Sequence, residues 1–382
     1  MATFITSKSV GQTINVYLNT STGYWKYNHD GNDSIPKQGN VSGIEVTNSN
    51  GEFTLIPCDV NGNPTGNVIG LDLRNNHITS FDGANLSTLN WLYLSDNQLT
   101  SFDGTDLTSL NDLYLINNQL TSLSGFILPT SLDYLYLTSN QLISVDVSSL
   151  INLSYLFLNN NQLTSFDGTD LTSLHWLDLE NNNLTSLNNF IFPSSLHLLF
   201  LGTNQLTTFD TTGLSSLTQL NLYGNQFTSF DTTGLSNLHQ LVLSSNQLTS
   251  LDVTGLSNLN DLRLDGNPLT PSANNQILQQ LNQNGMQYGY FPSSNGRTSE
   301  SNSSYNNLLN NLGWTFSGLD LPIVGNGKLR VRGVISTPSW DGGTIYNIGD
   351  VVTHEGQTWH CIQYAPAGYG PFGGYIDVYW TL

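Results

Sequence analysis

Large aromatic side chains recur beside paired leucines through the middle of the chain, and such rings bind ligands by stacking and cation–π contact. The leucines follow the pattern x-L-x-L-x, and in a strand the x side chains point away from the leucine side. We therefore expect one exposed aromatic face about 25 Å long, because adjacent strands are about 4.8 Å apart. The predicted ligand-binding residues of this face are Trp91, Tyr93, Tyr114, Tyr134, Tyr136, Tyr155, Phe157, Trp176 and Phe200.

Two interpretations of this aromatic pattern remain open. Monomeric proteins seldom expose a continuous apolar patch of this size without using it, which favours a binding face. Cross-strand aromatic pairs also stabilise a sheet by roughly 0.2–1 kcal/mol each, with no ligand involved. Polar residues on the same face fit a sugar, a protein surface or a cationic group. They are Asp112, Thr138, Asn159, Asp178 and Glu180.

A repeat of the form L-x-L-x-x-N-x-L must position these rings. Its asparagine recurs at intervals of 21 or 22 residues, and so strict a period predicts a solenoid whose units bury their leucines by stacking. The pattern resembles the leucine-rich-repeat family, with the 21/22-residue repeats of internalins. The resemblance implies a mainly β solenoid of about ten repeats in residues 68–270, with a parallel sheet on its concave face. The repeat asparagines are Asn76, Asn97, Asn118, Asn140, Asn161, Asn182, Asn204, Asn225, Asn246 and Asn267.

The other repeat positions have structural interpretations. We expect the asparagine side chains to bond to backbone inside the turns, because buried polar groups need partners. A phenylalanine stack is expected inside the solenoid, formed by Phe81, Phe102, Phe166, Phe209 and Phe230. Aspartates follow these positions on the convex side, where capping and turn roles suit them. These are Asp82, Asp103, Asp146, Asp167, Asp210, Asp231 and Asp252.

The segments on either side of the repeats are expected to cap the solenoid, because a terminal repeat otherwise exposes its leucines. Residues 1–67 alternate apolar and polar and predict a β-rich N-terminal cap or anchor. Residues 271–321 predict a helical C-terminal cap with helices over 272–284 and 304–312.

Residues 322–382 carry a second pattern, with Trp340, Tyr346, Gly349-Asp350 and the Gly356–Cys361 stretch in fixed order. It resembles the small carbohydrate-binding module of chitinases, which is also found in phage tail and fibre proteins. The resemblance implies a small three-stranded β module. The exposed tryptophan pair of the chitin-binding members is replaced here by Tyr364-Ala365-Pro366. The candidate ligand contacts of this module are Tyr364, Tyr369, Phe372 and Tyr375.

The charge distribution narrows the ligand class. The chain has 9 Lys and Arg against 28 Asp and Glu, and none of the 9 lies between Arg74 and Arg263. Nucleic acids and anionic bilayers are bound through cations, so neither is an expected partner of the solenoid. The sequence contains no apolar stretch of 18 residues, so membrane insertion is not predicted. Residues 1–16 lack the apolar segment of a secretory signal.

Catalysis is not expected. The sequence contains none of the common hydrolase, zinc-protease or phosphate-binding motifs, and no cofactor or metal is predicted. His175, His197 and His239 recur at one repeat position. We interpret them as polar residues at the edge of the strands, with a metal pair formed by the first two as the alternative.

These observations predict a non-enzymatic recognition or adhesion protein located on a virion surface or outside cells. In the favoured hypothesis it is a phage surface or fibre component that binds a host cell-surface glycan or protein, with residues 1–67 contacting other virion proteins. One alternative is a secreted, internalin-like bacterial adhesin that binds a host protein. Another is a structural or decoration protein that assembles with copies of itself.

Overall fold

The computed structural model of the 382-residue chain covers the solenoid almost continuously and both ends in part. It describes residues 2–6, 8, 12–20, 24–29, 32–33, 37–38, 41–45, 52–58, 68–84, 86–123, 128–187, 190–285, 287–317, 319, 351–354, 357–361 and 380–381.

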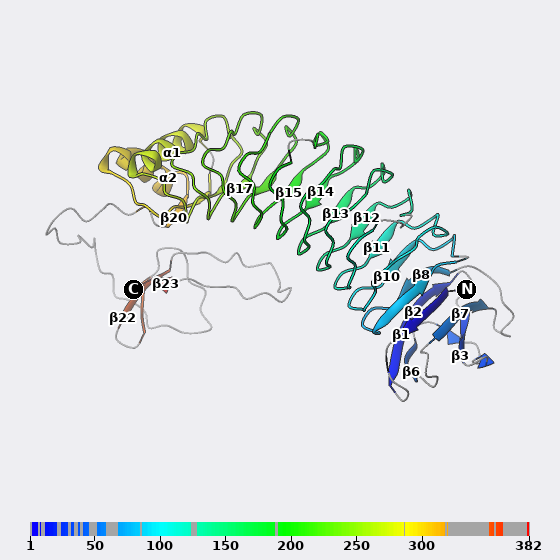
Figure 1. Ribbon diagram of the computed structural model, residues 1–382. Coiled ribbons are helices and arrows are strands. Elements are labelled where there is room, and N and C mark those ends of the chain that lie inside the picture. Colours follow the sequence, from blue (N-terminus) through cyan, green and yellow to red (C-terminus); the bar gives the residue numbers. More distant parts are fainter. Residues whose placement is uncertain are drawn as a thin grey trace.

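Each repeat contributes one short strand to a parallel sheet that lines the concave side of a curved solenoid (Figure 1). The middle leucines of adjacent strands lie opposite each other, as Leu92 and Leu113 do, because the repeats are nearly equal in length. The strands are β8 (Val68–Asp72), β10 (Trp91–Tyr93), β11 (Asp112–Tyr114), β12 (Tyr134–Tyr136), β13 (Tyr155–Phe157), β14 (Trp176–Asp178), β15 (Leu198–Phe200), β16 (Gln219–Asn221), β17 (Gln240–Val242) and β18 (Asp261–Arg263).

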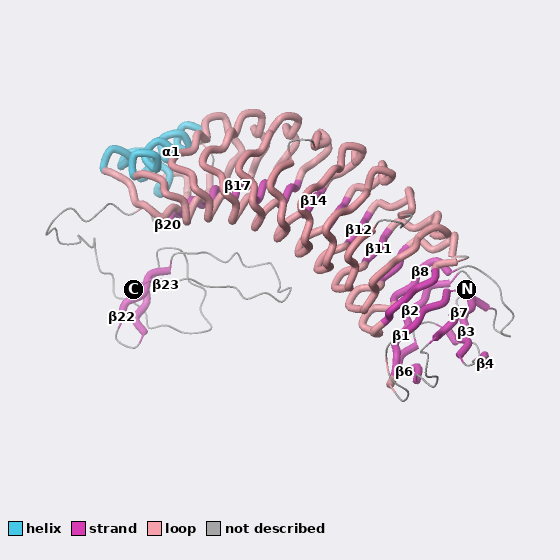
Figure 2. Tube along the Cα trace, in the orientation of Figure 1, coloured by secondary structure: helices cyan, strands magenta, loops and turns pink. Residues whose placement is uncertain are grey.

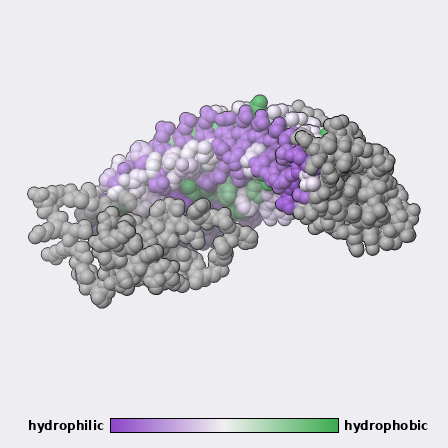
Figure 3. All heavy atoms as spheres, turned by 90° about the horizontal axis from the view of Figure 1, so that it is seen from below, coloured by the Kyte–Doolittle hydropathy of each residue, from purple (hydrophilic) through white to green (hydrophobic). Residues whose placement is uncertain are grey.

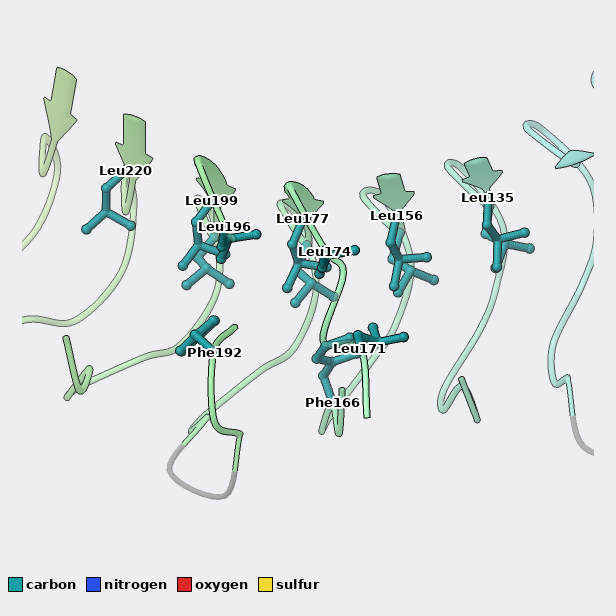
Figure 4. Close-up of a cluster of buried hydrophobic side chains, with 14 of the residues drawn as sticks. Leu135, Leu156, Phe166, Leu171, Leu174, Leu177, Phe192, Leu196, Leu199 and Leu220 are labelled. Carbon is teal, nitrogen blue, oxygen red and sulfur yellow. The ribbon is translucent and has the colours of Figure 1, made fainter. Parts of the chain in front are cut away.

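The core is a continuous column of leucines behind this sheet. The leucines of the strands point inward, and Phe166 and Phe192 meet them from the opposite wall (Figure 4). The expected phenylalanine stack forms in segments: Phe81 packs parallel to Phe102, and Phe209 lies parallel to Phe230. Between these segments, the chain inserts further rings from a 22-residue repeat. They are Phe190 and Phe192, which join Phe166 to Phe209 through edge and tilted contacts.

The repeat asparagines form the expected ladder of hydrogen bonds. Asn161 is representative: its Nδ2 donates to the carbonyl oxygens of Leu137 (3.0 Å) and Leu158 (2.9 Å). Its Oδ1 accepts from the backbone N–H of Leu142 at 3.0 Å. One amide therefore satisfies backbone groups of two successive repeats, which ties each repeat to the one before it.

The convex side is built from turns that aspartates close. The Asp167 carboxylate accepts hydrogen bonds from the N–H (3.1 Å) and the hydroxyl (2.7 Å) of Thr169. The backbone N–H two residues on is bonded in the same way at the other predicted positions, Asp82, Asp103, Asp146, Asp210, Asp231 and Asp252. Within the described part of residues 83–270 this side contains no helix, which agrees with the predicted turn role.

The N-terminal strands cover the first repeat. β2 pairs antiparallel with β8 and extends the solenoid sheet, while β1 pairs with β7 and β9 in a second sheet. Ile14 and Val16 of β2 are fully buried, so this segment closes the leucine core as expected for a cap. The strands are β1 (Ala2–Thr6), β2 (Thr13–Thr20), β3 (Tyr24–His29), β4 (Asn32–Asp33), β5 (Lys37–Gln38), β6 (Val41–Glu45), β7 (Glu52–Cys58) and β9 (Ile78–Asp82).

The C-terminal end of the solenoid carries both expected helices, α1 (Pro271–Asn284) and α2 (Asn302–Asn310) (Figure 2). A short 3₁₀ turn, η1 (Ser299–Ser301), directly precedes α2. The Thr270 hydroxyl caps the start of α1 by accepting from the Ala273 N–H, and Gly285 ends the helix with a φ of 74°.

Two strands that the sequence did not predict follow these helices. They are β19 (Tyr290–Pro292) and β20 (Thr315–Ser317), which continue the solenoid sheet in parallel and bring it to twelve parallel strands. The C-terminal cap is thus also an extension of the sheet.

Neither helix of the described chain has the length and apolar character needed to cross a membrane.

Three further strands lie in the C-terminal region, β21 (Val351–His354), β22 (Gln357–Cys361) and β23 (Trp380–Thr381). They pair antiparallel in the order β21-β22-β23. A three-stranded antiparallel unit is the arrangement implied by the sequence pattern of residues 322–382.

Candidate binding surface

All nine predicted aromatic residues lie on the concave face of strands β10 to β15, at the first or third position of a strand. The middle leucine of each strand is buried, while the aromatic side chains on either side of it are half-buried. Hydrophobic residues gather in the hollow of the solenoid between hydrophilic margins (Figure 3). We call these nine residues the aromatic face.

The rings of the aromatic face contact one another along the solenoid axis. Ring centroids are 4.5 Å apart for Tyr93 and Tyr114, 4.1 Å for Tyr114 and Tyr136, and 4.4 Å for Tyr136 and Phe157. The row continues through Trp176 to Phe200 with edge contacts of 4.9 and 5.6 Å. A second pair, Tyr134 and Tyr155, stacks at 4.4 Å beside this row.

Both interpretations of the aromatic pattern therefore have a physical basis in the structure. Each stacked pair stabilises the sheet by about 0.5–1.5 kcal/mol beyond the area it buries. Stacking also holds the rings in fixed orientations, so a ligand would order fewer side chains on binding.

Gly70 positions the first ring of the face, and sequence reasoning missed this residue. It lies in register with Trp91 of the next strand. A Cβ atom at residue 70 would be 1.9 Å from Cε2 of Trp91, so the indole lies directly against the glycine backbone. The sequence does indicate the role of this glycine, because Gly70 occupies the strand position that holds the large Trp91 side chain in the following repeat.

Two carboxyl groups lie among the rings. Asp112 is in register with Trp91 on one side and Tyr134 on the other. Its Oδ1 is buried and has no hydrogen-bond partner among the described residues. Burial, with the nearby Asp133 charge as a smaller cause, raises the pKa of Asp112.

Asp178 lies in register between Phe157 and Phe200 and is only 8% exposed. Burial raises the pKa of Asp178 to about 7, although the Glu180 N–H donates to its Oδ1 at 3.0 Å. Burial also raises the pKa of Glu180, whose carboxylate accepts a hydrogen bond from the Asn221 side chain. Asp178 therefore accepts a proton near neutral pH, which an ordinary aspartate does not.

A carboxylate and an arginine stand at each end of the concave face. Arg74 pairs with Asp72 (2.7 Å) and Arg263 pairs with Asp261 (2.9 Å). Each guanidinium also lies over a tyrosine ring, with Cζ 5.4 Å from the Tyr93 centroid and 5.8 Å from the Tyr290 centroid.

The recurrent histidines lie at the start of the strands. The rings of His175 and His197 are parallel with centroids 5.7 Å apart, and both residues are exposed. Among the described residues no three His, Cys, Asp or Glu side chains are grouped so as to hold a metal ion. The histidine rings continue the stacked row of Tyr134 and Tyr155, with 6.4 Å between Tyr155 and His175.

The candidate contacts of the C-terminal module lie outside the described residues. They are Tyr364, Tyr369, Phe372 and Tyr375. Their role remains a prediction from the sequence.

Models of known protein families match both the solenoid and the C-terminal region of the chain. The leucine-rich-repeat family model matches residues 172–227, and the model of carbohydrate-binding module family 5/12 matches residues 339–370. No match was found among the curated proteins.

Several solved structures are similar to the solenoid. The functional domain of InlJ from Listeria monocytogenes is 27% identical, with a TM-score of 0.55 over 66% of this chain and 54% of that chain. This chain thus spans about half the length of that structure. The InlJ domain includes a cysteine ladder, whereas the ladder described above consists of asparagine.

Two other neighbours have lower identity. An internalin of Listeria monocytogenes, InlF, is 21% identical over 69% of this chain and 91% of that chain, with a TM-score of 0.43. The leucine-rich-repeat ectodomain of a receptor kinase from Arabidopsis thaliana is 22% identical over 69% of this chain and 40% of that chain, with a TM-score of 0.47.

The repeat matches, the fold and the InlJ likeness lead to one assignment. The chain is a leucine-rich-repeat protein with a C-terminal segment similar to carbohydrate-binding modules.

Proposed function

We propose that this chain is a non-enzymatic recognition and adhesion protein that binds a cell-surface glycan or protein through its aromatic face, with the C-terminal module as a second contact. The observation that carries the proposal is the unbroken row of half-exposed rings from Trp91 to Phe200. Aromatic residues are enriched at the centres of interfaces, where they contribute much of the binding energy.

The favoured setting for this function is the surface or tail fibre of a phage. The sequence pattern of residues 322–382 is similar to modules of phage tail and fibre proteins, and residues 1–67 would contact other virion proteins. Labelling of intact phage particles with an antibody against residues 68–270, viewed by electron microscopy, tests this placement. Label found only on bacterial surfaces or in culture medium contradicts it.

A secreted or surface-exposed bacterial adhesin is the second candidate. The likeness to the InlJ domain, at 27% identity over 66% of this chain, favours it. In that setting the ligand of the aromatic face is a host protein. A cell-surface protein pull-down beside a glycan array separates a protein ligand from a glycan ligand.

The test of the aromatic face is the double variant Trp91→Ala with Trp176→Ala. Both indoles lie on the concave face, and we expect binding to cells and to the array to fall to background. Ile191→Ala is the matched control, because it removes a large apolar side chain that is 75% exposed on the opposite side. Full binding by the double variant would reject the aromatic face as the binding site.

Self-assembly is the structural alternative, and it makes a different prediction. If copies of the chain cover the aromatic face, the pure protein sediments as an oligomer and the double variant sediments as a monomer. Sedimentation as a monomer at all tested concentrations contradicts a self-assembly role for this face.

A further inference from the structure

Four carboxyl groups of the concave sheet lie in register with an aromatic ring of a neighbouring strand. Two are on the first and last strands of the leucine-rich repeats, β8 and β18, where Asp72 lies opposite Tyr93 and Asp261 lies opposite Tyr290. Two are in the interior of the sheet, where Asp112 and Asp178 each lie between a ring on either side. The same local arrangement of carboxylate and ring therefore occurs four times on one surface.

At both ends this arrangement is filled by a guanidinium of the chain itself. Arg74 donates from Nε and Nη2 to both oxygens of Asp72 and lies over Tyr93. Arg263 donates in the same way to Asp261 and lies over Tyr290. A planar cation is stabilised there by two interactions, the paired hydrogen bonds to the carboxylate and the cation–π contact with the face of the ring.

In the interior the arrangement is empty of cations. Among the described residues, Oδ1 of Asp112 has no hydrogen-bond partner, and Asp178 accepts only the Glu180 N–H. The sequence has no Lys or Arg between Arg74 and Arg263, so these repeats cannot supply the cation. Buried carboxyl groups without a partner are costly and are uncommon in native structures.

We infer that Asp112 and Asp178 are binding positions for two basic side chains of an extended segment of a protein ligand. The inference rests on the proposed function, because it assigns a ligand class to the aromatic face. Each arginine of the ligand would pair with one carboxylate and stack on the rings beside it, as Arg74 and Arg263 do at the ends. The partner is thus a protein with a basic, extended segment.

The spacing sets the length of that segment. Asp112 on β11 and Asp178 on β14 are three strands apart, which is about 14 Å along the solenoid axis at about 4.8 Å per strand. Asp112 is the first residue of its strand and Asp178 is the third, so they are also about 7 Å apart along the strand direction and about 16 Å apart in all. An extended chain rises about 3.3 Å per residue and presents alternate side chains to one face. Arginines four residues apart are therefore on the same side and about 13 Å from each other, and their long side chains can span the few remaining ångströms to the two carboxylates.

Titration calorimetry of the full chain with a synthetic peptide tests the inference. The probe is a seven-residue glycine–serine peptide with arginine at its second and sixth positions, and the peptide control carries citrulline at both. We expect saturable binding of the arginine peptide and none of the citrulline peptide. A peptide with arginines only two residues apart should bind at least about tenfold more weakly, because it can reach one carboxylate at a time.

Isosteric variants identify the positions. Asp112→Asn and Asp178→Asn should each weaken the arginine peptide by about tenfold or more, since a charge-assisted hydrogen bond is lost. Asp210→Asn is the matched control, because it changes the net charge equally on the convex side. Melting curves of all variants should stay within a few degrees of the wild type, since neither interior carboxylate makes a hydrogen bond that an asparagine cannot keep.

Equal binding of the citrulline peptide, or unchanged binding by both interior variants, overturns the inference. Carboxylate-dependent binding of a glucosamine hexamer with no binding of the arginine peptide also overturns it, in favour of a cationic glycan. The proposed function fails separately. If the double tryptophan variant loses cell binding while Asp112→Asn and Asp178→Asn retain it, the aromatic face binds its ligand without cations and only this inference is wrong.

Discussion

Aspartate occurs on both faces of the solenoid, and the two faces shift its pKa in opposite directions. On the concave face, burial among aromatic rings raises the pKa of Asp112 and takes that of Asp178 to about 7. On the convex face, hydrogen bonds from a hydroxyl and a backbone N–H lower the pKa of six aspartates, Asp103, Asp146, Asp167, Asp210, Asp231 and Asp252. The same residue type is thus destabilised as an anion on one side and stabilised on the other.

The difference separates two roles within one repeat. A convex aspartate accepts hydrogen bonds within its own turn, so its charge stabilises the fold and is already paired with donors of the chain. Asp112 and Asp178, the concave aspartates that no arginine of the chain meets, have few partners, and their ionised forms cost free energy until a cation arrives. Charge on the concave face is therefore available to a ligand, whereas charge on the convex face belongs to the fold.

Gly70→Ala should have the largest effect, because it tests how tightly the concave side is packed. The backbone of Gly70 is ordinary strand, but a Cβ there would overlap the Trp91 indole. We expect a loss of up to about 3 kcal/mol in the free energy of unfolding, together with a shift in tryptophan fluorescence as the indole moves. Urea unfolding measures the loss, and wild-type stability with an unshifted spectrum would show that the indole does not depend on this glycine.

Asp178→Asn should stabilise the protein increasingly as pH rises from about 4 to about 7. The folded protein holds the Asp178 proton more tightly than the unfolded chain does, so ionisation of this group costs stability that grows over that pH range and is constant above it. We expect the variant to be more stable by about 2 kcal/mol at pH 8, with the difference vanishing near pH 4. Urea unfolding at both values checks this, and an equal difference at both pH values would contradict it.

Gly234→Ala is the convex counterpart of the first change. Gly234 has a φ of 86°, and an added Cβ would meet nothing within 4 Å. The loss should come from the left-handed backbone alone, at about 1 kcal/mol, with no change in tryptophan fluorescence. A loss as large as that of Gly70→Ala would remove the contrast in packing between the two faces.

Asp146→Ala should have the smallest effect and the opposite pH dependence to Asp178→Asn. Asp146 accepts hydrogen bonds from the N–H and hydroxyl of Ser148, and its pKa is lowered by them. The stability that it adds is present above pH 4 and is lost as pH falls further. Because the site is exposed, we expect a loss of only about 0.5 kcal/mol at pH 7 and none near pH 2. Asp146→Asn keeps both acceptor bonds and serves as the control; a loss that persists at pH 2 would contradict the role of the charge.

Much of the fold and the position of the aromatic face could be predicted because the repeat is local. The interval of 21 or 22 residues places successive leucine pairs in register, and alternation along a strand then sends the flanking residues to the opposite side. Trp91, Tyr136 and Phe200 lie on the concave face for that reason. Strands β19 and β20 escaped prediction because the leucine pair is absent there, and buried Phe291 and Trp314 occupy the core instead.

The amino-acid sequence by itself determined the solenoid, its asparagine ladder and the side of the sheet on which the rings lie, since each follows from spacing within one repeat. Only the tertiary structure decided which groups meet across repeats. The indole of Trp91 lies on Gly70, Asp112 and Asp178 lie between rings, and Arg74 and Arg263 fill the equivalent positions at the ends. These contacts depend on side-chain orientation and on the register of neighbouring strands, and burial among the assembled rings is what raises the pKa of the two interior carboxyl groups.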